Sequence, residues 1–218
     1  MNANSLKHNI VDFYGRDFVV TKDVLIPRPE TEMMIDTVLD LAGRSYLPGV
    51  KPKEAVLAEK CKILDVGTGS GCIAVTLKLE LPEAQITASD VSELALKVAQ
   101  ENATRLGAKV KFIKSDLLGN ISGDFDVVVA NLPYVDKDWD WIDKKALSKE
   151  PSIALYADNH GLALIYRLID QATERKVSRL VLEADPCQHQ KIISYAKDRN
   201  YQLNGIHGFA ICLSILRA

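Results

Sequence analysis

The stretch "ILDVGTGSGCIA", residues 63–74, joins a predicted buried strand to a predicted helix through a turn that contains Gly67, Gly69 and Gly71. Glycines let the backbone adopt unusual dihedral angles and let a ligand approach the main chain closely. The N-terminus of the following helix favours a negative group. Asp90 ends the next predicted strand, where a carboxylate accepts hydrogen bonds from both hydroxyls of a ribose. The stretch therefore predicts a nucleoside-like ligand at the carboxyl edge of a sheet.

Strands and helices alternate outward from this turn. Strands are predicted over residues 62–66, 85–90, 109–116, 125–131 and 179–184, and helices over 70–79, 92–107, 161–176 and 189–200. Two consecutive tail strands, 201–206 and 209–216, predict an antiparallel hairpin, and a short hairpin around Gly15 precedes a helix that begins near Pro29. This rhythm indicates a doubly wound, mostly parallel α/β sheet of seven strands.

Composition narrows the classes of function. The chain has 218 residues, 47% of them hydrophobic, with a formal net charge of −2 and no long Lys/Arg block, so an extended polyanion such as nucleic acid is not the expected partner. The four cysteines and four histidines lack metal-ligand spacing, which predicts no metal site. No signal peptide and no apolar run long enough for a bilayer are present, so we expect a cytoplasmic protein without membrane attachment.

A second motif, "VVVANLPY" at residues 127–134, is typical of a strand buried on both faces that ends in polar and aromatic groups. A planar amide or arylamine is a poor nucleophile because its lone pair is delocalised. Asn131 Oδ1 and the Leu132 carbonyl could each accept one N–H of such a group, while Tyr134 stacks on its flat face. Pro133 restricts Leu132 to extended conformations, which helps to hold that carbonyl. The alternative is an ordinary polar turn, and the glycine turn upstream favours the clamp.

The glycine spacing distinguishes two ligands. A nicotinamide dinucleotide site asks for Gly or Ala at Cys72, and neither is present. The observed D-x-G-x-G-x-G, counted from Asp65, resembles the first motif of S-adenosylmethionine-dependent methyltransferases of the Rossmann-like class I. The cofactor contacts that this resemblance implies are Asp65, Gly67, Thr68, Gly69, Ser70, Gly71, Asp90, Asp116, Leu117 and Asn131. Asp116 would read the adenine, or else is a solvated turn residue.

Four segments together resemble the HemK/PrmC family, which methylates the glutamine of the GGQ motif in peptide chain release factors. They are "LIPRPETE" (residues 25–32), "ILDVGTGSGCIA", "NLPY" and "EPSIAL" (residues 150–155). The resemblance implies a methyltransferase domain over residues 25–218 and an extension over 1–24. It also implies a substrate site with Asn131, Leu132, Pro133 and Tyr134 as catalytic clamp and with Arg28 and Glu30 at the cleft mouth. The alternative for Arg28 and Glu30 is an ordinary helix start.

Three features depart from that family. Leu132 replaces the first proline of N-P-P-Y, which keeps the carbonyl but stiffens it less. Only about a dozen residues precede "FYGRDF", so we expect the family's separate N-terminal helical domain to be absent. The tail lacks the family's aspartate-to-arginine pattern.

The loop "DKDWDWIDKK", residues 136–145, combines Trp139 and Trp141 with acidic residues. This combination is suited to binding a basic segment of another protein. The alternative is a loop whose tryptophans fold inward.

The expected activity is therefore methylation of a glutamine side chain in a release factor or another translation protein, with S-adenosyl-L-methionine as cofactor. Two alternatives stay open: a nucleic-acid adenine methyltransferase, which would need the same kind of clamp after base flipping, and a non-catalytic remnant that binds cofactor or a partner. The sequence does not indicate an oligomeric state.

Overall fold

The computed structural model describes residues 9–44, 55–143, 145 and 150–216. Its strands are β1 (Asn9–Phe13), β2 (Arg16–Val20), β3 (Lys62–Val66), β4 (Gln85–Asp90), β5 (Lys111–Lys114), β6 (Val127–Ala130), β7 (Arg179–Glu183), β8 (Tyr201–His207) and β9 (Ala210–Ile215). Its α-helices are α1 (Glu32–Leu41), α2 (Cys72–Glu80), α3 (Glu93–Leu106), α5 (Ala163–Glu174) and α6 (His189–Lys197). Short 3-10 turns cover Pro29–Thr31, Ser152–Ala154 and Pro186–Gln188.

The main sheet has seven strands in the order β5-β4-β3-β6-β7-β9-β8. The first five strands are parallel to one another, and β9 pairs antiparallel with both β7 and β8. The predicted doubly wound sheet with an antiparallel C-terminal hairpin is confirmed. The strand order reverses direction at β3, between β4 and β6, and open α/β sheets bind ligands outside the carboxyl ends of the strands at such a point.

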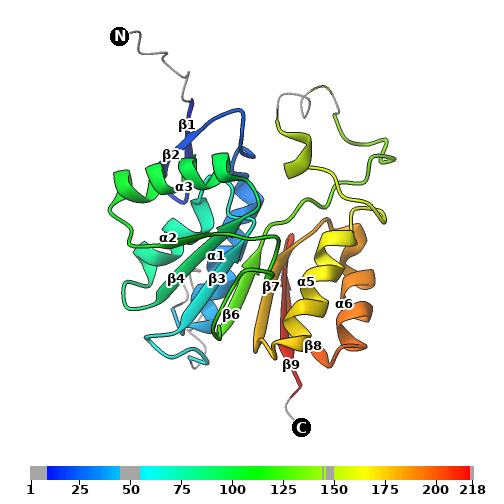
Figure 1. The fold of residues 1–218 in the computed structure, drawn as a ribbon. Helices are drawn as coiled ribbons and strands as arrows, with labels where there is room; N and C mark the ends of the chain where they lie inside the picture. Colours follow the sequence, from blue (N-terminus) through cyan, green and yellow to red (C-terminus); the bar gives the residue numbers. More distant parts are fainter. Residues whose placement is uncertain (1–8, 45–54, 144, 146–149, 217–218) are drawn as a thin grey trace.

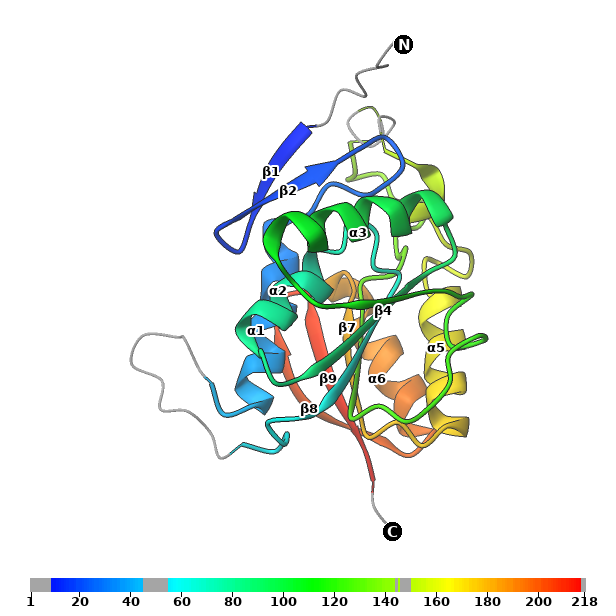
Figure 2. The same cartoon turned by 60° about the vertical axis from the view of Figure 1, so that its left-hand side comes forward.

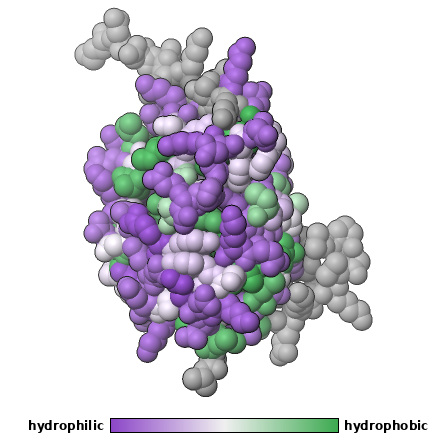
Figure 3. Space-filling model, turned by 90° about the vertical axis from the view of Figure 1, so that its right-hand side faces the viewer, coloured by the Kyte–Doolittle hydropathy of each residue, from purple (hydrophilic) through white to green (hydrophobic). Residues whose placement is uncertain are grey.

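Helices cover both faces of this sheet. Helices α1, α2 and α3 lie on one face and α5 and α6 on the other (Figure 1). Strand β6 contributes to both hydrophobic layers, because Val127 and Val129 join the cluster under α1 to α3 and Val128 and Ala130 join the cluster under α5 and α6. Alternate side chains of a strand point to opposite faces, which explains the unbroken apolar run of this central strand. The outer surface over α5 and α6 is mainly hydrophilic (Figure 3).

The predicted N-terminal hairpin is present as β1 and β2, with Tyr14 and Gly15 at its turn, and it lies beside α3 (Figure 2). Phe13 and Phe18 pack edge to face with ring centroids 6.0 Å apart, and both are buried in the same cluster as α1 and α2. Asn102 of α3 donates to the carbonyls of Val19 and Ser70 and accepts from the amide of Val19. One buried side chain therefore ties the hairpin to the glycine turn.

Most element boundaries differ from prediction by a few residues, and two of these differences have a clear physical cause. The helix expected from residue 70 begins at Cys72, because Gly71 has a φ of +81° and serves as its left-handed N-cap. The strand expected over 109–116 is limited to Lys111–Lys114, since it lies at the sheet edge and pairs only with Thr87–Asp90 of β4. Within the described part of the chain, no helix is both long and apolar enough to cross a bilayer.

Candidate active site

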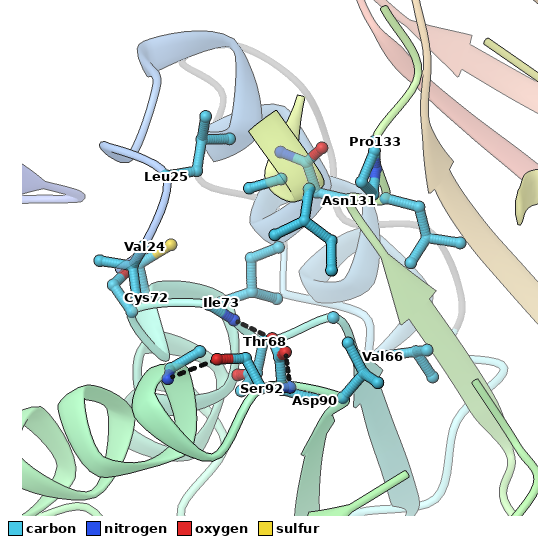
Figure 4. Close-up of a pocket in the computed structure, with 18 of the residues that line it drawn as sticks. Val24, Leu25, Val66, Thr68, Cys72, Ile73, Asp90, Ser92, Asn131 and Pro133 are labelled. Carbon is cyan, nitrogen blue, oxygen red and sulfur yellow. Dashed lines mark hydrogen bonds between the residues drawn. The ribbon is translucent and has the colours of Figure 1, made fainter. Parts of the chain in front are cut away.

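A cavity of about 330 Å³ opens at the carboxyl ends of β3, β4 and β6, where the strand order reverses. The glycine turn, Asp90 and Ser92 lie at one end, and Asn131 and Pro133 lie at the other (Figure 4). The lining also includes the segment before α1, residues 115–117, Ile153, Ala154 and Leu164. Residues that are far apart in the sequence therefore meet around one space of the size that binds small molecules.

The glycine turn forms the base of this cavity. Gly67, Gly69 and Gly71 have φ angles of +74°, +54° and +81°, which non-glycine residues adopt only with strain. A Cβ on Gly71 would lie 2.9 Å from Cβ of Ala99, and one on Gly67 would lie 3.0 Å from Cδ2 of Leu132. The three glycines thus permit the turn, the close packing of α2 on α3, and the close approach of the turn to the clamp segment.

Asp90 lines the cavity and is anchored by the backbone. Its Oδ2 accepts from Gly69 N at 3.0 Å and its Oδ1 from Ser92 N at 2.8 Å. Burial raises the pKa of this carboxyl above its usual value. The remaining lone pairs of the two oxygens are positioned to accept hydrogen bonds from a ligand with neighbouring hydroxyls.

Asp65 lies beneath the turn and is not part of the cavity lining. Its Oδ2 accepts from Thr68 Oγ1 at 2.7 Å and from Ala74 N at 3.2 Å, so it holds the turn against the start of α2. Its Oδ1 is buried without a hydrogen-bond partner among the described residues. Burial raises the pKa of Asp65 to about 7. Its contact with a ligand is indirect in this geometry, through the turn that it supports.

The cavity is lined by four of the residues predicted as cofactor contacts, namely Thr68, Ser70, Asp116 and Leu117, whereas Gly71 lies behind it. The carboxylate of Asp116 is largely exposed and accepts from Arg167 at 2.8 Å. Leu117 is buried with a φ of +48°, an unusual conformation for any residue that carries a Cβ. Backbone strain of this kind gathers at ligand-binding sites.

The clamp segment closes the far end of the cavity. Asn131, Leu132 and Pro133 line it, whereas Tyr134 lies just outside the lining. Asn131 Nδ2 donates to Thr31 Oγ1 at 3.1 Å, which leaves Oδ1 as the side-chain atom that can accept from a ligand. The backbone behind Tyr134 is fixed as well, because Gln188 Nε2 donates to its carbonyl at 2.8 Å.

Arg28 lines the cavity and forms an ion pair with Glu150, whose Oε2 also accepts from Ile26 N at 3.0 Å. The "IPRPE" and "EPSIAL" segments therefore meet at the cleft mouth. Glu30 is exposed and outside the lining, at the start of the turn before α1. Trp139 and Trp141 stack with ring centroids 5.0 Å apart, and Trp141 is 61% exposed, so it does not fold inward.

Two buried residues next to the clamp were not predicted from the sequence. Thr31 bonds to Asn131, and Glu183 at the end of β7 accepts from the Tyr134 hydroxyl at 3.1 Å. Glu183 ends an apolar strand that is parallel to β6. The carboxyl ends of parallel strands meet at one edge of a sheet, so this position in the sequence could have indicated that Glu183 lies near Asn131. Thr31 sits inside the quoted "IPRPETE" motif without a distinguishing pattern of its own.

Comparison with known proteins agrees with this geometry. A family model described as "Methyltransferase small domain" matches residues 36–145. A release factor glutamine methyltransferase of Koribacter versatilis is 45% identical over 166 residues, which cover 75% of this chain and 55% of that protein. A bifunctional methyltransferase of Rickettsia bellii is 35% identical over 221 residues, covering 90% of this chain and 39% of that protein. The chain thus spans about half the length of the curated relatives it matches, or less.

Solved structures show the same fold at low identity. The ribosomal protein L11 methylase of Lactobacillus delbrueckii subsp. bulgaricus aligns with a TM-score of 0.58 and 22% identity, over 89% of this chain and 81% of that chain. A 16S rRNA N2 G1207 methyltransferase of T. thermophilus was solved with AdoMet and guanosine. It aligns with a TM-score of 0.64 and 12% identity, over 97% of this chain and 50% of that chain.

Proposed function

Because the chain belongs to the methyltransferase small domain family, we propose that it transfers a methyl group from S-adenosyl-L-methionine to the side-chain amide nitrogen of a protein glutamine. The observation that carries this proposal is the placement of Asn131 and Leu132 across one cavity from the glycine turn and Asp90. The acceptor we propose is the GGQ glutamine of a peptide chain release factor, which is the substrate class in the name of several relatives.

The cavity fits the cofactor in three respects. The positive-φ glycines leave backbone without Cβ atoms at its base, and the N-terminus of α2 favours a carboxylate there. Asp90 offers carboxylate oxygens to the ribose hydroxyls. Leu117 and Asp116 line the side of the cavity at the end of β5, where an adenine would lie. When bound, S-adenosylmethionine supplies a methyl group activated by a positively charged sulfur.

The clamp has the chemistry to orient an amide. Asn131 Oδ1 and the Leu132 carbonyl each accept one N–H of the acceptor, which fixes its nitrogen and favours the pyramidal geometry needed for in-line attack. Pro133 keeps Leu132 extended, and Tyr134 stacks on the flat amide. Arg28 and Glu30 at the mouth contact the polypeptide that carries the glutamine.

We further propose that residues 1–24 form an extension of the catalytic domain, which covers residues 25–218. The acidic loop with Trp139 and Trp141 contacts a basic segment of the acceptor protein, since Trp141 is exposed between aspartates. An acceptor in the translation machinery places the reaction in the cytoplasm.

The experiment is a transfer assay with cofactor labelled in the methyl group. Three acceptors are compared: a release factor, its variant with alanine in place of the GGQ glutamine, and adenine-containing oligonucleotides. We expect label only in the release factor with the intact glutamine. Labelled oligonucleotides together with an unlabelled release factor would instead assign an adenine methyltransferase, and no transfer to any acceptor would indicate a binding protein without catalysis.

Asn131 provides the matched variants for this assay. Asn131→Ala removes one amide acceptor and should lower the rate of methyl transfer by about a hundredfold or more, as the loss of a preorganised polar group does elsewhere. Cofactor affinity should change much less, because the glycine turn and Asp90 remain. Asn131→Asp keeps an acceptor but adds a charge, so a rate near that of the wild type would mean that geometry alone suffices.

A further inference from the structure

Glu183 is a carboxylate buried beneath the clamp. It ends β7 with 1% of its surface exposed, at the same sheet edge as Asn131 after β6. A buried carboxylate is costly unless hydrogen-bond donors surround it. Its Oε1 accepts from the Tyr134 hydroxyl at 3.1 Å, and the side chains of Thr31 and Asn131 lie near enough to favour its ionised form. Its Oε2 is buried without a hydrogen-bond partner among the described residues.

These contacts join both ends of the clamp. Asn131 Nδ2 donates to Thr31 Oγ1 at 3.1 Å and lies near the Glu183 carboxylate, so acceptors are found on the nitrogen side of this amide. A rotation of the amide by half a turn would lose the hydrogen bond to Thr31 and would place Oδ1 near the negative carboxylate of Glu183. The Tyr134 ring is held at its far end by the same carboxylate.

Building on the proposed methyltransferase function, we propose that Glu183 is a positioning residue that fixes the Asn131 amide with Oδ1 toward the acceptor and fixes the Tyr134 ring beside it. Thr31 supports the arrangement, because its hydroxyl accepts a hydrogen bond from Asn131 Nδ2. Glu183 does not line the cavity, so it acts through Asn131 and Tyr134. The ionised carboxylate is the working form, because both of its oxygens are acceptors only, whereas a protonated carboxyl would add a donor of its own.

The surroundings of Glu183 make its ionisation sensitive to pH. Burial, with Glu30 adding a like charge, raises the pKa of Glu183 to about 7, and hydrogen bonds from Thr31, Tyr134 and Asn131 oppose that rise. Burial raises the pKa of the Cys72 thiol in α2, and this thiol lies close enough for the charge of Glu183 to contribute to that rise. Protonation at lower pH therefore weakens the hold on the clamp, and methyl transfer should decline as the pH falls below about 7.

The test compares Glu183→Gln with the wild type on one release factor acceptor. We expect kcat to fall by about ten- to hundredfold, as small misplacements of reacting groups do, with cofactor affinity by calorimetry unchanged within about twofold. The decline of kcat on the acid side should disappear in Glu183→Gln, which separates Glu183 from Asp65. A kcat and an acid-side decline equal to those of the wild type would overturn the proposal, as would a loss confined to cofactor affinity.

Thr31 gives a matched pair that keeps the test decisive if Glu183→Gln does not fold. Thr31→Val keeps the shape and removes the hydroxyl, so kcat should fall, whereas Thr31→Ser keeps the hydroxyl and should retain the wild-type kcat. Equal rates in the two variants would overturn the proposal.

A readout without activity separates this inference from the proposed function. The side-chain amide resonances of Asn131, assigned by their loss in Asn131→Ala, should titrate near pH 7 in the wild type and stay constant in Glu183→Gln. Their failure to titrate in the wild type would refute the role of Glu183 even if methyl transfer is observed. A wild type that labels no glutamine but shows this titration would refute only the proposed function.

Discussion

The glycine turn offers a direct test of close packing, because Gly71 and Gly107 have similar backbones and different surroundings. Their φ angles are +81° and +72°, so alanine is strained at both positions. A Cβ at residue 71 would lie 2.9 Å from Cβ and 3.1 Å from Cα of Ala99, whereas a Cβ at residue 107 would meet nothing within 4 Å. Gly71→Ala should therefore destabilise the fold more than Gly107→Ala.

The magnitudes follow from two terms. A non-glycine residue in the left-handed region costs roughly 1–2 kcal/mol, and this applies to both variants. Gly71→Ala adds an overpacking cost of about 1–3 kcal/mol, because its Cβ meets the backbone of α3 as well as a methyl group. The restriction of the unfolded chain by alanine is common to both and cancels in the comparison. The expected difference between the two variants is thus about 1–3 kcal/mol.

Urea unfolding followed by circular dichroism measures this difference, and thermal unfolding should place the Tm of Gly71→Ala lower by about 2–12 °C. Calorimetric titration with S-adenosylmethionine adds a functional readout, since the displaced turn should bind the cofactor more weakly in Gly71→Ala only. Two variants that agree within about 0.5 kcal/mol would show that α2 and α3 separate without cost, and the steric account of Gly71 would be wrong.

Three further predictions concern single side chains. Leu132→Pro keeps the carbonyl and stiffens it, so the methyl-transfer rate should be preserved or raised; complete loss in a folded variant would mean that the Leu132 N–H or side chain is required. Asp90→Ala should weaken calorimetric cofactor binding by about 1.5–3 kcal/mol, or about tenfold or more, and an unchanged affinity would remove Asp90 from the site. Burial raises the pKa of Asp65 from 3.8 to about 7, so the folded protein holds an extra proton between these values and its stability falls as the pH rises through that window. Glu183, whose pKa is also raised to about 7, contributes its own fall in both proteins. Asp65→Asn should lack only the part due to Asp65, which amounts to about 4 kcal/mol at most. If urea unfolding shows the same change in stability from pH 4 to pH 8 in wild type and variant, the assignment is wrong.

The sheet was predictable because its strands and helices follow hydrophobic period and turn chemistry. "KILDV" and "VVVA" are short, mainly apolar runs that end at a glycine or an asparagine turn, and both are central strands. The first residue of α2 was less predictable. The left-handed N-cap at Gly71 depends on packing against α3 rather than on local propensity.

The candidate site was predictable where ligand chemistry imposes a local pattern. The glycine turn, Asp90 and the "NLPY" segment carry such patterns, and the structure brings them to one cavity. Glu183 and Thr31 carry none, because their importance depends on burial next to Asn131. The meeting of Arg28 with Glu150 joins segments 122 residues apart, and only the three-dimensional fold determines such a pairing.

The triple role of Asn102 has a practical consequence for protein engineering. Its side chain binds both backbone groups of Val19 and the carbonyl of Ser70. A fragment cut at residue 25, the start that we propose for the catalytic domain, would leave Asn102 with two hydrogen-bonding groups unmatched beside the ligand site. It would also uncover Val98 and Ala95, which pack against Val20. Libraries, fusions and crystallisation fragments should therefore treat β1 and β2 as inseparable from the cofactor cleft.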